Sequence, residues 1–77
     1  MSLIEKNLKH KSKTFIREIV EDLLNFESSG FLQKDSNADK FLLDIFGKEY
    51  EKNRVAYLNI LAKETFKFIT KQYYNIN

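Results

Sequence analysis

The sequence contains no cysteine, no proline and no tryptophan, and its 77 residues include only two glycines and one histidine. Without cysteine the chain can form neither a disulfide bond nor a thiolate zinc site. The lack of proline and the scarcity of glycine leave few helix-breaking residues, which favours long helices. Gly30 and Gly47 are isolated, so the glycine-rich loops of the common nucleotide-binding motifs are excluded.

Long hydrophobic runs are also missing. After Leu3 and Ile4 the chain continues with Glu5, Lys6 and Asn7, whereas a secretory signal needs about 7–15 apolar residues in succession. No window approaches the roughly 20 apolar residues of a membrane-spanning helix. We therefore expect no membrane span and a cytoplasmic location.

A chain of 77 residues fits a single helical domain, residues 1–77. Small domains bury a smaller fraction of their surface than large ones, so the core is marginal. With no disulfide or zinc site to compensate, we expect the fold to depend on well-packed helices and on a second copy of the chain or another partner.

The first helix is predicted over about residues 3–27. Ser2 and Glu5 have the spacing of a capping box, and Gly30 supplies the left-handed residue that helix ends favour. Between Lys9 and Lys13 like charges crowd together and apolar residues lapse, so a break there remains an alternative. The expected buried face comprises Ile4, Leu8, Phe15, Ile19, Leu23 and Phe26.

A short helix is predicted over about residues 37–46 and a long one over about 48–74. Ser36 and Asp39 have capping-box spacing, and Gly47 separates the two helices. Phe31 and Leu32, in the connection before the short helix, are expected to close one end of the core. The buried face of the long helix is expected to comprise Tyr50, Tyr57, Leu58, Leu61, Thr65, Phe68 and Ile69.

The predicted fold class is all-α. Two long helices and one short helix enclose a core poorly, and the second half of the first helix is apolar over about half of its circumference. We therefore expect two copies to associate into a homodimeric bundle of about four long helices.

Charge is segregated along the chain. Residues 1–17 carry a net charge of +4, residues 18–51 of −6 and residues 52–77 of +4. This pattern indicates that the ends fold over the acidic centre or pair with it in another copy. Lysine outnumbers arginine eleven to two, a composition associated with AT-rich genomes of low-GC bacteria and phages, which suggests a phage or mobile-element origin.

No catalytic, cofactor-binding or metal-binding set is expected. His10 lies among lysines with no adjacent carboxylate to orient its ring. Glu18 and Asp22 are spaced to share a metal, but no histidine follows as in di-metal bundles, so they are expected to face solvent. The acidic run from Asp35 to Asp39 is better explained by helix capping than by a calcium loop, because the glycine and glutamate that such a loop requires are absent. We therefore expect a protein that is not an enzyme.

The leading prediction is a small interaction module of the adaptor, inhibitor or regulator type that self-associates and docks on another protein. Leu24, Phe31 and Tyr74 are its candidate contacts. The alternative is a DNA- or RNA-binding regulator that uses basic helix faces, although the acidic centre and the scarcity of arginine count against it. Its candidate contacts are Lys6, Lys9, Lys13, Arg17, Lys63, Lys67 and Lys71.

Overall fold

The computed structural model describes residues 2–73, and every regular element in that range is an α-helix. The predicted all-α class is therefore confirmed. The helices are α1 (Leu3–Leu8), α2 (Lys13–Ser29), α3 (Asn37–Phe46), α4 (Lys48–Lys52) and α5 (Arg54–Tyr73).

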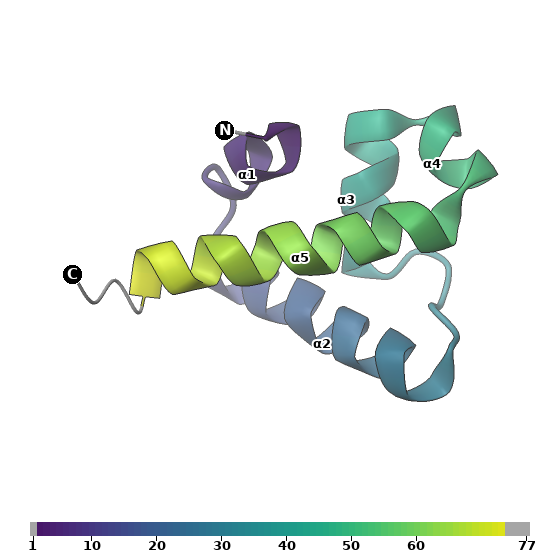
Figure 1. Ribbon diagram of the computed structural model, residues 1–77, viewed down its shortest axis with the longest axis horizontal. Helices are drawn as coiled ribbons and strands as arrows, with labels where there is room; N and C mark the ends of the chain where they lie inside the picture. The colour runs from purple at the N-terminus through teal and green to yellow at the C-terminus, as the bar shows by residue number, and fades with distance from the viewer. Residues whose placement is uncertain (1, 74–77) are drawn as a thin grey trace.

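The longest helix, α5, is the centre of the arrangement and contacts all four other helices. In Figure 1, α2 runs antiparallel to α5 along one side, and α1 lies on the other side near the C-terminal half of α5. The helices α3 and α4 gather at the N-terminal half of α5, where α3 also contacts α2. Helices from both ends of the chain thus pack together around α5.

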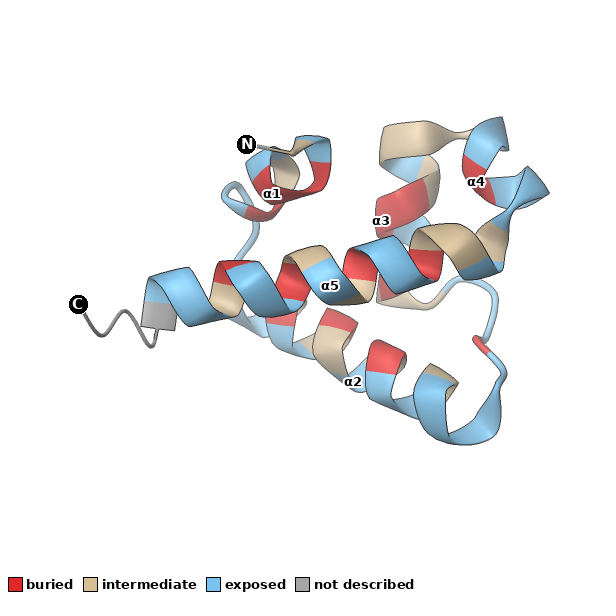
Figure 2. Ribbon diagram, viewed as in Figure 1, coloured by how far each residue is buried: buried red, intermediate tan, exposed pale blue. Residues whose placement is uncertain are grey.

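The core lies where α5 meets the other helices. Figure 2 shows that the buried residues of α2 follow the edge of that helix that faces α5. Most residues of the predicted buried faces are buried, and Phe15, Phe26, Tyr57 and Ile69 are partly buried against them. The buried apolar residues are Ile4, Leu8, Ile16, Ile19, Leu23, Leu32, Ala38, Phe41, Leu42, Tyr50, Leu58, Leu61 and Phe68.

The helix predicted over 3–27 is divided into α1 and α2. The break falls in the lysine-rich segment that was the alternative, and Ser12 begins the new helix by accepting a hydrogen bond from the Phe15 amide at 3.1 Å. Like charges in one turn weaken a helix, and residues 9–14 offer no apolar side chain to hold it in place. The break lets α1 turn back onto α5 and bury Ile4 and Leu8.

The helix predicted over 48–74 is also divided, at Asn53. This residue leaves the helical conformation with φ −147° and ψ 56°, and asparagine is among the weaker helix formers. Residues 51–54 are all polar, so no buried side chain holds this turn in the helix. The break lets α4 pack against α3 while α5 takes its own direction.

The predicted caps at Ser2, Gly30, Ser36 and Gly47 are confirmed, whereas the predicted end of the long helix at residue 74 lies outside the described residues. The Ser2 and Ser36 hydroxyls accept hydrogen bonds from the amides of Glu5 and Asp39. Gly30 ends α2 with φ 73°, and Gly47 separates α3 from α4 with φ 56°, conformations that other residues rarely adopt. These local signals set where the elements begin and end.

The two breaks change the argument for a dimer. The dimer was predicted because two long helices and a short one leave a core open. In the structure, α1 and α4 are separate helices that cover further parts of the core. One copy therefore encloses a core, and self-association stays a prediction that depends on the apolar residues left outside. None of the helices in residues 2–73 is long and apolar enough to cross a membrane.

Candidate interaction surface

An apolar groove runs along the surface between α2 and α5. The antiparallel packing of the two helices buries Leu23 and Leu58 at its floor and leaves Leu24 and Phe66 on its walls. The groove has a volume of about 280 Å³. Its lining residues are Leu23, Leu24, Phe26, Glu27, Leu58, Asn59, Ala62 and Phe66.

The walls of this groove are unusually exposed for large apolar side chains. Leu24 is 53 % exposed and Phe66 is 46 % exposed. Val55 lies on the same face of α5 as Phe66, at helical spacing through Asn59 and Ala62, and is also exposed. Single exposed apolar residues need no explanation, but a contiguous group around a groove is typical of an interaction site.

The three predicted protein contacts lie in different places. Leu24 is in the groove between α2 and α5. Phe31 is 70 % exposed beside a separate hollow in the α2–α3 connection, so it does not close the core, whereas Leu32 beside it is buried as expected. Tyr74 lies outside the described residues. Phe66, on the α5 wall of the groove, was not among the predicted contacts.

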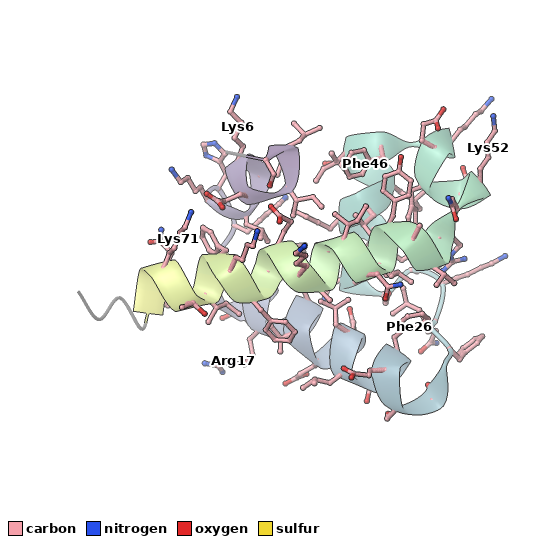
Figure 3. The ribbon with its side chains drawn as sticks, in the orientation of Figure 1. Lys6, Arg17, Phe26, Phe46, Lys52 and Lys71 are labelled. Atoms are coloured by element: carbon pink, nitrogen blue, oxygen red, sulfur yellow. The ribbon has the colours of Figure 1, made fainter. Side chains whose placement is uncertain are left out.

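The predicted basic contacts gather toward one end of the molecule. Lys6 and Lys9 come from the α1 region, which packs on α5, and α5 carries Lys67 and Lys71. In Figure 3, Lys6 points away from α1 on one side of α5, Arg17 lies on the opposite side, and Lys71 lies between them. The cations therefore surround this end of the fold and do not line one flat face.

Two of these lysines are paired with acids. Lys71 lies 3.6 Å from Glu5 of α1, and Lys67 lies 3.8 Å from Glu64 within α5. A hydrogen bond with the Ser2 side chain lowers the pKa of Glu64, and nearby lysine charges lower it further. The two acids reduce the net positive charge of this region.

The prediction that the basic ends pair with the acidic centre is met only in part. Arg54 from the basic C-terminal segment pairs with Asp39 of the acidic middle at 2.9 Å. Lys67 and Lys71, in contrast, pair with acids of the terminal segments. The fold therefore brings the two basic ends together more than it lays them over the acidic centre.

Contrary to the prediction, Glu18 and Asp22 do not simply face solvent. Asp22 accepts a hydrogen bond from the Ala38 amide at 3.0 Å, and Glu18 accepts one from the Asn37 side chain. Both carboxylates thus hold the N-terminus of α3, where the helix dipole favours negative charge. Their spacing of one helical turn places both carboxylates where they can reach the same end of α3. Within residues 2–73, no group of three metal-ligating side chains is placed to hold a metal ion.

A buried polar network joins α3, α4 and α5. The Asp39 carboxylate accepts hydrogen bonds from the Tyr50 hydroxyl at 2.6 Å and from the Arg54 guanidinium at 2.9 Å. Its other oxygen accepts one from the Asp35 amide at 3.3 Å, and Asp35 has a left-handed φ of 67°.

Tyr50 in this network is fully buried. Burial, followed by its hydrogen bond to Asp39 and the charge of Asp39, raises the pKa of Tyr50 to about 12. A neutral phenol with no access to solvent and a carboxylate with its oxygens engaged are suited to holding helices together. The network therefore positions α3, α4 and α5 relative to one another.

His10 is exposed in the α1–α2 connection, as expected.

The chain matches no protein-family model, and no curated protein or solved structure is significantly similar to it. Among the described residues, the α2/α5 groove and the basic end are the candidate surfaces on which a functional proposal can be built.

Proposed function

We propose that this protein is a small non-enzymatic interaction module that works by burying the α2/α5 groove against another protein chain. The observation that carries the proposal is the exposure of Leu24 and Phe66 on opposite walls of one apolar groove. A helix or loop with apolar side chains at helical spacing would fill such a groove. The same proposal places the module in the cytoplasm as an adaptor, inhibitor or regulator.

The distribution of polar groups supports a binding role over a catalytic one. Asp39, Tyr50, Glu18 and Asp22 are engaged in contacts between helices. The groove itself is lined mainly by apolar side chains, with Glu27 and Asn59 as its polar residues. Such a surface offers contact area and little chemistry, which is what docking requires.

Replacing Leu24 with glutamate tests this proposal. A carboxylate at the wall of the groove must be desolvated when a partner covers it, so we expect binding to weaken by about 2 kcal/mol, or about thirtyfold. The measurement is quantitative mass spectrometry of proteins captured from the native host by immobilised wild-type and variant chains. Leu3→Glu is the matched control, because Leu3 is 51 % exposed on α1, away from the groove.

The proposal predicts a set of proteins captured by the wild type and by Leu3→Glu but lost with Leu24→Glu. Additional copies of this chain count among those proteins. If the two variants capture the same proteins in equal amounts, the groove is not the docking surface.

A second candidate function is binding to DNA or RNA through the basic end of the molecule. The observation that favours it is that α1 packs on α5, which brings the basic terminal segments together. Lys63, Lys67 and Lys71 also border a shallow hollow that contains Phe66. Lysines beside an exposed aromatic ring can contact phosphates and stack a base.

Replacing Lys63, Lys67 and Lys71 together with glutamine tests this second function. If these lysines contact phosphates, the affinity for single-stranded and double-stranded oligonucleotides should fall, and the slope of log K against log salt should decrease by up to about 3. Fluorescence anisotropy at several salt concentrations measures both. The control with the same change in net charge is replacement of Lys34, Lys40 and Lys48, from the acidic middle. Equal losses in the two triple variants would mean that only net charge matters.

A further inference from the structure

The outer face of α2 has an ordered charge pattern. Arg17, Val20, Leu24 and Glu27 follow each other at spacings of three, four and three residues, so they lie on one face of the helix. Arg17, Leu24 and Glu27 are exposed and Val20 is half-buried. Along this face a cation is followed by two apolar residues and then by an anion.

This face is complementary to itself when two copies of α2 pack antiparallel. If the two-fold axis passes at the level of Asp22, Arg17 of one copy lies opposite Glu27 of the other. Val20 of one copy then lies opposite Leu24 of the other. The spacing is that of alternating core positions in an antiparallel coiled coil. A parallel pair would instead place Arg17 against Arg17 and Glu27 against Glu27, which is repulsive. The pattern thus selects one orientation.

Neither Arg17 nor Glu27 has an ion-pair partner within the described part of one copy. None of the ion pairs described for residues 2–73 includes Arg17 or Glu27. In the antiparallel pair each copy supplies one cation and one anion, so two ion pairs flank the apolar centre. An interface that uses the same surface of both subunits is the usual arrangement of homodimers.

The apolar centre of this face adjoins the groove. Leu24 belongs both to the outer face of α2 and to the wall of the groove, opposite Phe66 of α5. A second α2 laid across the first would therefore cover the exposed apolar residues of the groove as well. Asn59 and the small Ala62 on the α5 wall leave room for the close approach of another helix.

We propose that the chain that covers the groove is a second copy of this protein, which packs through α2 in a two-fold antiparallel arrangement with Arg17 facing Glu27. This inference rests on the proposed function, since it names the occupant of the same groove. It specifies the register of the dimer by residue and the charges of the two flanking contacts.

Charge reversal tests the register. In Arg17→Glu alone, both flanking contacts become anion against anion, and in Glu27→Arg alone both become cation against cation. We expect each variant to dimerise about tenfold more weakly than the wild type. A one-to-one mixture of the two variants restores both pairs, because each contact then joins glutamate to arginine. Sedimentation velocity over a range of concentrations measures dimerisation, and circular dichroism checks that each variant is folded.

The mixture is expected to return to wild-type affinity, as is the double variant Arg17→Glu/Glu27→Arg. Leu24→Glu is expected to abolish the dimer, while Leu3→Glu retains it. A wild-type chain that remains monomeric at high concentration, or a mixture no stronger than the single variants, overturns the inference. Either result leaves the proposed function standing if Leu24→Glu still loses a different captured protein. Capture that is insensitive to Leu24→Glu counts against the proposed function itself.

Discussion

Replacing Asp39 with alanine is expected to lower the free energy of unfolding by about 3 kcal/mol, because a buried carboxylate that holds three helices is removed. The Tyr50 hydroxyl loses its acceptor in a fully buried position. Arg54 loses its ion-pair partner, and the Asp35 amide, in a left-handed turn, loses the oxygen that accepts its hydrogen bond. For a domain of this size the melting temperature should fall by roughly 12–24 °C.

Urea unfolding followed by circular dichroism measures this loss. Asp44→Ala is the matched control, since Asp44 is an exposed aspartate on the same helix, and we expect it to change the stability by no more than about 0.5 kcal/mol. Arg54 keeps 31 % of its side chain in solvent, so water can replace part of its lost contact. The loss of stability should therefore come mainly from Tyr50 and from the turn at Asp35 that precedes α3. A cost for Asp39→Ala similar to that of Asp44→Ala would contradict the role of the network.

The second large effect is a loss of stability in alkali that depends on Tyr50. Its pKa rises from 10.0 to about 12 in the folded protein because of burial, the hydrogen bond to Asp39 and the charge of Asp39. The neutral phenol is therefore favoured by folding. The stabilisation is fully present below pH 10 and is lost as the pH rises from 10 towards 12. A shift of this size corresponds to about 2–3 kcal/mol.

Comparison of the wild type with Tyr50→Phe isolates this effect. The variant lacks the titrating group, so its stability should fall less than that of the wild type between pH 10 and 12. At pH 7 it should be less stable by about 1–2 kcal/mol, because Asp39 loses one donor. Chemical unfolding at several pH values measures both quantities. Parallel curves for the two proteins above pH 10 would show that Tyr50 does not titrate as the structure indicates.

The interaction surface was only partly predictable from sequence. Leu24 was identified because the second half of the first helix has more apolar residues than one neighbour can cover. Phe66 was not, because an aromatic residue near the edge of an amphipathic face can lie in the core or outside it. Its position depends on how α5 is rotated against α2 in the fold that buries Leu23, Leu58 and Phe68 in one core.

Local interactions decided the class and the ends of the elements. The shortage of helix breakers, the serines at the starts of α1 and α3, and the glycines after α2 and α3 act within a few residues, so the sequence alone specifies them. The periodic apolar faces likewise predicted most of the core. These signals need no knowledge of which helices become neighbours.

Contacts between distant residues were decided only by the tertiary structure. A helix that could continue through Lys9–Lys13 or Asn53 stops there because the turned-back segments bury Leu8 and Tyr50 against other helices. Glu18 and Asp22 look like solvent-facing acids until α3 brings its N-terminus to them. Asp39 looks like a capping residue until Tyr50 and Arg54 reach it from α4 and α5. The sequence specifies periodicity and caps because these depend on near neighbours, whereas the partners of buried carboxylates depend on the packing of the whole chain.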